Sequence, residues 1–312
     1  QGRFDTTIWY LCGGDKPDLY FWVEAFIGGC WTVVYKPPLP CNVDWNYVCG
    51  SEVTIRVTDP RVPVCEEPPD LDGLQVAVMS IGNNVSISEI QASGAGQGLT
   101  TSGGPFGGRL EPHVWFSRAA LISAGITHYR WSYQRLTKAD GSAVSDSWHA
   151  MDRRVIRHYA MIENTPPDYP LSFPAYNLGP DPAFGSKNLF QIQPINVPVT
   201  PPAGSTITGW AAWLDAREDL ASAFFMSHQL AGGDAALAAG NYQLKFELFD
   251  SSGNLVNLSD SGILLKEADQ AAPFGSGTVT TKPAPDHHRI KDGSGKTIGF
   301  KLVLRIDNNP CE

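Results

Sequence analysis

The placement of the cysteines constrains the fold of this chain more than any other feature. Five of the six lie within the first 65 residues, and the set is Cys12, Cys30, Cys41, Cys49, Cys65 and Cys311. Disulfides persist outside the cytosol, and small modules with thin cores depend on them most. Structural zinc sites favour closely spaced cysteine pairs, and the sequence contains no Cys-x-x-Cys. We therefore predict an extracellular or cell-surface protein with a disulfide-rich first module.

The pairing of these cysteines stays open, because six cysteines allow 15 connectivities. Two short loops of the first module would be closed by the pairs Cys12–Cys30 and Cys41–Cys49. Cys65–Cys311 would then tie the rest of the chain end to end. Alternatively, Cys311 would bond a first-module cysteine of another copy, and such a head-to-tail contact that does not close gives a filament.

The amino-acid composition further narrows the class of protein to which this chain can belong. Only 18% of the 312 residues are charged, and 31 glycines and 24 prolines make the chain rich in turns, as in β-rich secreted proteins. The net charge of −9 argues against nucleic acid as a partner, because phosphates require a basic surface. No apolar run is long enough to predict a membrane span. The chain starts at Gln1 without a visible signal peptide, which indicates a mature chain or a fragment of a longer protein.

Period-two alternation of apolar and polar residues predicts strands throughout the chain. In the first module we expect strands at 6–11, 19–27, 30–35 and 52–58. In the remainder we expect them at 74–79, 85–90, 125–133, 155–161, 240–250 and 298–306. Strands this close together, with turn residues between them, predict antiparallel sheets. Trp9, Trp22, Trp31 and Trp131 fall in strands, which predicts core or inter-module positions.

These patterns divide the chain into two modules and a linker. Residues 1–65 form a small disulfide-rich β module, 66–72 form a Pro-rich acidic linker, and 73–312 form a large β-sandwich domain. Within the large domain, glycine and serine predict a long loop at 92–108, and prolines predict irregular or edge structure at 164–204. One short helix is predicted at 214–230, since Asp215, Glu218 and Asp219 suit a helix N-terminus. The fold class is therefore all-β, with antiparallel β-sandwich modules in tandem.

Two segments carry a family resemblance. Gly240-Asn241-Tyr242, the alternating residues up to Asp250 and then Gly253-Asn254 resemble the late hairpin of immunoglobulin-like or fibronectin-like modules of bacterial surface proteins. Gly125 to Trp131 resembles the tryptophan-bearing central strand of such a sandwich. Residues 1–65 are similar, more loosely, to transthyretin-like modules. The resemblance implies β-sandwiches, although the Cys…Trp…Cys framework of antibodies is absent around Trp131.

Several motif-like segments have structural interpretations. Residues 293–297 imitate the end of a phosphate-binding loop, but Ile290 replaces its first glycine and a strand follows, so we predict a hairpin turn. His287 and His288 are adjacent and would point to opposite faces of a strand, which makes them poor co-ligands and favours surface positions. Two glycosylation sequons begin at Asn84 and Asn257. No catalytic signature is present, so we do not expect an enzyme.

Two kinds of ligand site remain as predictions. Aromatic side chains could stack on sugars, and the candidates are Trp45, Tyr47, Trp148 and Trp210. Carboxylate and amide oxygens could bind calcium, and the candidates are Asp307, Asn308, Asn309, Asp70 and Asp72. No other cofactor is expected.

These observations lead to one main hypothesis and two alternatives. The main hypothesis is an extracellular structural protein, a subunit or segment of a surface fibre, appendage or matrix. It would assemble head-to-tail with other copies of itself, through edge strands and an intermolecular disulfide. The first alternative is a secreted carbohydrate-binding or adhesion module that contacts a polysaccharide or host surface. The second is a glycan-processing hydrolase, with Asp215, Glu218 and Asp219 as the acids considered.

Overall fold

The chain divides into two compact units, and each is described by itself. The computed structural model describes residues 19–27, 30–36, 43–44, 73–82, 85–162, 171–198, 211–213, 221–269 and 280–309. Unit 1 comprises residues 1–67 with 275–277, and unit 2 comprises 68–274 with 278–312. Predictions that fall on other residues, such as the strands at 6–11 and 52–58, lie outside the described ranges.

The described part of unit 1 consists of two antiparallel strand pairs. One joins β1 (Leu19–Tyr20) to β4 (Val43–Asp44), and the other joins β2 (Val23–Ile27) to β3 (Cys30–Tyr35). The predicted strand at 30–35 is confirmed as β3, whereas the predicted strand at 19–27 is divided at residues 21–22 into β1 and β2, which pair with different partners. Trp22 lies between β1 and β2 and is 56% exposed, so a core position is wrong for it, and the inter-module position stays a prediction.

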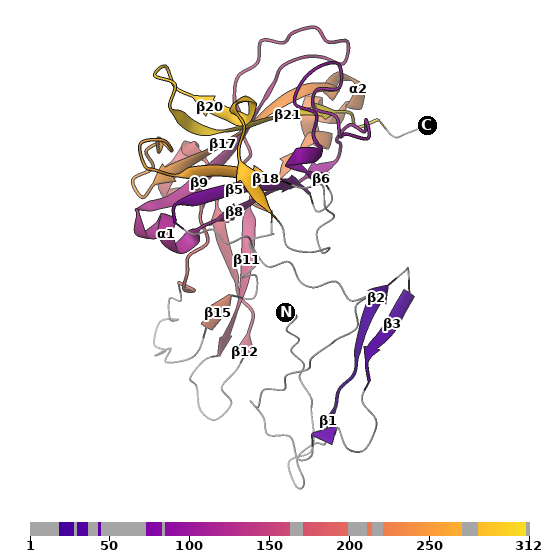
Figure 1. Cartoon of the computed structure of the whole chain (residues 1–312), viewed down its shortest axis with the longest axis vertical. Helices are drawn as coiled ribbons and strands as arrows, with labels where there is room; N and C mark the ends of the chain where they lie inside the picture. The colour runs from indigo at the N-terminus through magenta and orange to yellow at the C-terminus, as the bar shows by residue number, and fades with distance from the viewer. Residues whose placement is uncertain are drawn as a thin grey trace. The chain divides into compact units, whose positions relative to one another are not determined.

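Unit 2 is built on a six-stranded antiparallel sheet, called here the large sheet (Figure 1). Its strands run in the order β10 (His149–Ala150), β9 (Ile126–Arg135), β17 (Gly240–Asp250), β21 (Thr297–Ile306) and β20 (Arg289–Lys291), and β14 (Phe190–Gln191) pairs with the start of β9. The predicted strands at 125–133, 240–250 and 298–306 are confirmed as β9, β17 and β21.

The second sheet of the sandwich has β5 at its centre. Its strands are β19 (Thr281–Pro283), β18 (Leu264–Ala268), β5 (Gln75–Ile81), β6 (Val85–Ser86) and β8 (Pro112–Phe116). β18 pairs with β5 in parallel, whereas the other pairs in this sheet are antiparallel. The predicted all-antiparallel arrangement is therefore correct except at this pair, which joins segments about 190 residues apart in sequence and leaves no local signal.

Alternation along the strands builds the core between the two sheets. In β17, Tyr242, Leu244, Phe246 and Leu248 are at most 3% exposed, while the residues between them face outward or lie less deeply. Trp131 of β9 is fully buried, as predicted, and its indole N–H donates to Ser222 Oγ at 3.0 Å. Ser222 Oγ in turn donates to the Pro112 carbonyl of β8, so this hydroxyl links the two sheets.

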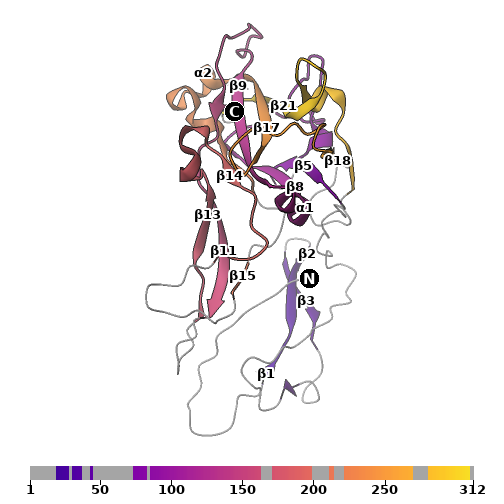
Figure 2. The ribbon, with the colours of Figure 1, turned by 90° about the vertical axis from the view of Figure 1, so that its left-hand side faces the viewer.

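A third, four-stranded sheet extends from the sandwich. β11 (Val155–Ile162) pairs antiparallel with its three neighbours, β12 (Leu171–Ser172), β13 (Ala175–Gly179) and β15 (Ala211–Trp213). Figures 1 and 2 show these strands projecting away from the sandwich, and we call them the arm. Part of the segment 164–204, predicted to be irregular or edge structure, is therefore edge strand, because β12 and β13 lie at the two ends of the strand order β12-β11-β13.

The glycine-rich segment 92–108 is a loop, as predicted, and it covers an edge of the large sheet. Gly98 and Phe106 exchange backbone hydrogen bonds with Arg305 of β21. At Gly98, φ is +81° and a β-carbon would lie 2.5 Å from the Arg305 nitrogen, so only glycine fits there. Strand edges left open promote pairing with other chains, so this loop protects β21.

The predicted helix at 214–230 is wrong over its described part. Phe225–Met226 form strand β16, which pairs with β7 (Arg109–Leu110), and Ser227–Gly233 form irregular 3₁₀ turns, η3. Phe225 is 1% exposed, so core insertion and strand pairing outweigh the helix propensity of the flanking alanines. Over the part of the chain that the structure describes, the α-helices are α1 (Arg118–Ser123) and α2 (Ala235–Ala238), with further 3₁₀ turns η1 (Ile87–Glu89), η2 (Pro182–Lys187) and η4 (Asp286–His288).

Candidate interaction surface

The face of the large sheet that points away from the core is polar, and we call it the outer sheet face. Because side chains alternate along strands, residues paired across β9, β17 and β21 share this face in rows. One row is Arg130–Glu247, another is Ser132–Lys245–Lys301, and a third is Gln134–Gln243–Val303. Arg305, four residues after Lys301 on β21, lies on the same face opposite Asn241.

A buried carboxylate organises the centre of this face. Glu247 is 5% exposed and accepts from Arg130 Nη2 at 2.7 Å, while Lys245 Nζ lies 3.1 Å from its other oxygen. The Arg130 guanidinium also lies over the Phe249 ring, 4.9 Å from its centroid. These contacts fix the positions of Arg130 and Lys245, since each is held from two directions.

Trp148 lies at the margin of the outer sheet face. It directly precedes β10, and its ring centroid lies 4.6 Å from Lys245 Nζ, a cation–π contact that reaches across β9. The side chain remains 40% exposed, so Lys245 covers only part of the indole. Of the four predicted sugar-stacking residues, Trp148 is the one that the structure describes; Trp45, Tyr47 and Trp210 lie outside the described ranges.

The outer sheet face has an excess of positive charge. Lys245 and Lys301 are direct cross-strand neighbours, and like charges in this arrangement repel. Lys245 is compensated by Glu247, whereas Lys301 has no ion pair within the described ranges. Arg305 donates to the neutral oxygens of Ala139 and Asn241. The face therefore carries four cations, on Arg130, Lys245, Lys301 and Arg305, against the carboxylate of Glu247.

The predicted calcium ligands that the structure describes form what we call the C-terminal clip, residues 307–309. Gly108 N donates to Asn308 Oδ1 at 2.8 Å, and Asn308 Nδ2 donates to the Ser227 carbonyl at 3.0 Å. Asp307 Oδ1 accepts from the backbone and side-chain nitrogens of Asn309. These contacts fasten the end of β21 to its neighbours, while the calcium assignment, which includes Asp70 and Asp72 outside the described ranges, stays a prediction.

Metal binding has no further candidate in the described ranges. No group of three or more His, Cys, Asp or Glu side chains there is placed to hold a metal ion. Of the cysteines, Cys30 starts β3 and the other five lie outside the described residues, as do the acids at 215, 218 and 219. Within the same ranges, no helix has the length and apolar character that crossing a membrane requires.

Among the described residues, the most deeply buried ion pair joins the second sheet to the turn before β20. Glu267 Oε2 of β18 lies 2.6 Å from His288 Nδ1, and both side chains are at most 7% exposed. His287 is exposed, as predicted, but the predicted surface position of His288 is wrong. The His288 ring packs against Phe300 of β21 at 5.3 Å between ring centroids and lies edge-on to the His287 ring at 4.3 Å. Glu267 shares the buried face of β18 with Leu265, and a carboxylate at such a position is the signal that the sequence could have provided.

A second buried histidine lies at the start of β9. His128 is 5% exposed, its Nε2 lies 3.3 Å from Asp181 Oδ2, and its ring packs edge-on against Phe184 at 4.6 Å. Burial lowers the pKa of His128, and the Asp181 carboxylate opposes that shift. The contact between His128 and Asp181 joins β9 to η2. Because the His128 ring is enclosed, it offers no reactive surface.

Tyr129, the next residue on β9, is buried as well. Burial raises the pKa of Tyr129, whose hydroxyl donates to the Ser222 carbonyl at 2.7 Å.

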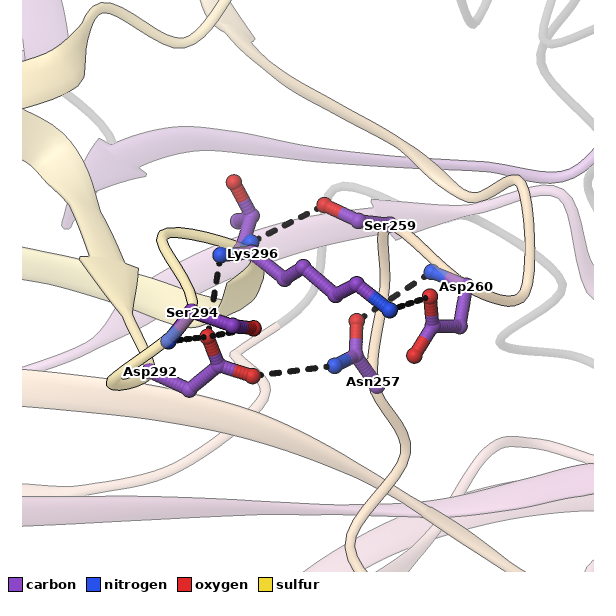
Figure 3. A network of polar contacts seen from close by, with 7 residues as sticks. Asn257, Ser259, Asp260, Asp292, Ser294 and Lys296 are labelled. Atoms are coloured by element: carbon purple, nitrogen blue, oxygen red, sulfur yellow. Dashed lines mark hydrogen bonds and ion pairs between the residues drawn. The ribbon is translucent and has the colours of Figure 1, made fainter.

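The segment that imitates a phosphate-binding loop is a hairpin turn between β20 and β21, as predicted. Figure 3 shows Asp292 at its centre, where Oδ1 accepts from the nitrogens of Ser294 and Lys296 and from Ser294 Oγ. These donors hold the pKa of Asp292 below its usual value. Asn257 of the second sequon donates to Asp292 Oδ2 at 3.3 Å, so its amide nitrogen is engaged in the same network.

No protein-family model, curated protein or solved structure matches this chain.

Proposed function

We propose that this chain is an extracellular structural protein, a subunit or segment of a surface fibre, appendage or matrix that links head-to-tail with further copies. The proposal begins with the six cysteines, which favour an oxidising environment, and with Cys311 in particular. The observation that carries it is the C-terminal clip. A covalent link at the end of a chain can bear load only if the preceding residues are fixed to a stable body.

The clip supplies that fixation. Asn308 bonds to Gly108 and Ser227, and Asp307 N donates to the Phe106 carbonyl at 2.9 Å. Cys311 follows three residues after Asn308 in the sequence, directly beyond the clip and one further residue. β21 itself lies inside the large sheet and pairs with β17 from Gly240–Ile306 to Phe246–Phe300. Tension applied at Cys311 would therefore be transmitted to a strand with continuous pairing.

The covered edges of the sandwich favour the disulfide over strand addition as the link. The loop at 98–106 covers the edge of β21, and the Pro112 end of β8 bonds to Ser222. In the arm, β13 pairs with β11 on one side, and no described strand pairs with its other side. β13 is accordingly the strand that we would examine first for pairing between copies. The kinship to immunoglobulin-like modules remains a prediction.

The disulfide link predicts a ladder of oligomers that depends on Cys311. Native material run without reductant should give bands at multiples of the 33.8 kDa chain, and reductant should collapse them to one band. Cys311→Ser should remove the ladder without changing the far-ultraviolet circular dichroism, because the clip ends at Asn309. A Cys311→Ser protein that keeps the same ladder would contradict the proposed link.

A carbohydrate-binding or adhesion module is a second candidate, and the exposure of Trp148 favours it. A 40% exposed indole beside amides and cations can stack on a sugar ring while polar groups meet the hydroxyls. Trp148→Ala should then lower affinity for a polysaccharide at least tenfold by isothermal calorimetry, with the oligomer ladder intact. Equal affinity of the two proteins would remove this candidate and leave the structural proposal in place.

A further inference from the structure

We propose that the outer sheet face binds an anionic polysaccharide, with Lys245 and Lys301 contacting a carboxylate or sulfate group and Trp148 stacking on a neighbouring sugar ring. This inference rests on the second candidate function and specifies its ligand class. It starts from the two lysines, which are paired across β17 and β21 although their charges repel. Glu247 already compensates Lys245, so an anion that binds beside Lys301 would relieve the repulsion that remains.

Charge complementarity supports this ligand, because the face differs from the rest of the molecule. The chain as a whole has a net charge of −9, so a surface with four cations and one carboxylate does not reflect its composition. Glu247 is buried beneath Arg130 and Lys245, where it orders the cations and presents little negative surface. Asp146, at the edge, accepts from Arg135 N and lies 2.9 Å from His149 Nε2.

The spacing of the groups fits a sugar chain. The Trp148 ring lies 4.6 Å from Lys245 Nζ, and Lys301 is one strand further across the sheet. β21 lies three strands from β10, and neighbouring strands are about 4.8 Å apart, so the backbones that carry Trp148 and Lys301 are separated by roughly 14 Å. A short oligosaccharide spans that distance, with one ring stacked on Trp148 and a later ring presenting its acidic group to the lysines.

The neighbouring amides could select a sugar over a simple polyanion. Gln134 and Gln243 are cross-strand neighbours in the row beside the lysines, and both are partly exposed. Gln134 Nε2 donates to the Asp146 carbonyl, and its amide oxygen, which accepts no hydrogen bond from the described residues, can accept one from a hydroxyl. A sheet face is flat and rigid, so these groups need little reorganisation to meet an extended glycan.

The experiment compares matched polymers with and without charge. Polygalacturonate is tested against its methyl ester, and dextran sulfate against dextran, by calorimetry of the full chain in low and high salt. We expect the charged member of at least one pair to bind, and the pair that responds distinguishes carboxylate from sulfate recognition. Raising NaCl from about 0.05 M to about 0.5 M should weaken this binding strongly, because salt screens exposed charges.

Matched variants then locate the site. Lys301→Gln should weaken binding of the charged polymer about tenfold, since a charge-assisted hydrogen bond contributes roughly 1.5–3 kcal/mol. Lys282→Gln is the control, because it removes another partly exposed lysine, from β19 in the other sheet, and should leave binding unchanged. Trp148→Ala should also weaken binding, which a purely electrostatic contact would not require.

The outcomes separate the two claims. Equal binding of charged and neutral polymers that is lost in Trp148→Ala would overturn the anionic ligand and keep the carbohydrate-binding function. If polyglutamate binds as tightly as the charged glycans and Trp148→Ala does not change its affinity, the ligand is an acidic peptide and not a glycan. No change in any polymer's binding on replacing Trp148 or Lys301 would overturn both.

Discussion

Replacing Glu267 with alanine should lower the free energy of unfolding by about 3–5 kcal/mol, because it leaves His288 buried without its partner. The two side chains meet at 2.6 Å, and Glu267 is 3% exposed. Water cannot replace the lost carboxylate in such an enclosed position. Urea unfolding, followed by circular dichroism, measures the difference.

Two further variants test whether the burial of the pair is the cause. Asp269→Ala removes a carboxylate just beyond β18 whose ion pair with Lys282 is half exposed, so it should cost at most about 1 kcal/mol. Replacing Glu267 and His288 together with leucine should cost less than Glu267→Ala, because no unpaired polar group remains. If Glu267→Ala and Asp269→Ala have the same small effect, the pair does not stabilise the sandwich.

Trp131→Ala should destabilise unit 2 by about 3–5 kcal/mol, because it opens a cavity at the centre of the sandwich. Trp131 is fully buried, packs against Phe246 at 5.2 Å between ring centroids, and donates its indole N–H to Ser222. Its loss removes both the packing and the link between β9 and the segment beside β8.

Trp148→Ala is the matched control, since it deletes the same type of side chain from the margin of the outer sheet face, directly before β10. It should change the free energy of unfolding by less than about 1 kcal/mol, because Trp148 is 40% exposed. Urea unfolding compares the two proteins under identical conditions. A similar decrease in the free energy of unfolding for Trp131→Ala and Trp148→Ala would mean that the core is not centred on Trp131.

Local alternation made the long strands of the sandwich predictable. In β17, every second residue from Tyr242 to Leu248 is apolar, and the predicted span 240–250 coincides with the strand. β8 gives no such signal, because it begins with Pro112 and all five of its residues are buried. A strand that is buried on both faces has no polar side to alternate, so sequence shows only a short apolar run.

The parts that sequence could not predict depend on contacts between distant segments. The parallel pairing of β18 with β5 and the rows of the outer sheet face are set by register, which neighbouring residues do not encode. The sequence marks Trp148 as a sugar-stacking candidate by its residue type alone, whereas its contact with Lys245 is visible only in the folded structure. The buried His288 was mispredicted because adjacent histidines look alike in sequence, and a 3₁₀ turn separates their environments.

The most direct test of the structural proposal is to map the partner of Cys311 in a mixture of isotope-labelled and unlabelled copies that have been reduced, mixed and oxidised together. Mass spectrometry of the digested, unreduced protein identifies each cysteine pair and the copy from which each half came. We predict that the Cys311 peptide is joined to a first-module cysteine peptide carrying the other label. Cys311 peptides joined only to cysteines with the same label would mean that the bond closes within one chain, and the covalent fibre would be contradicted.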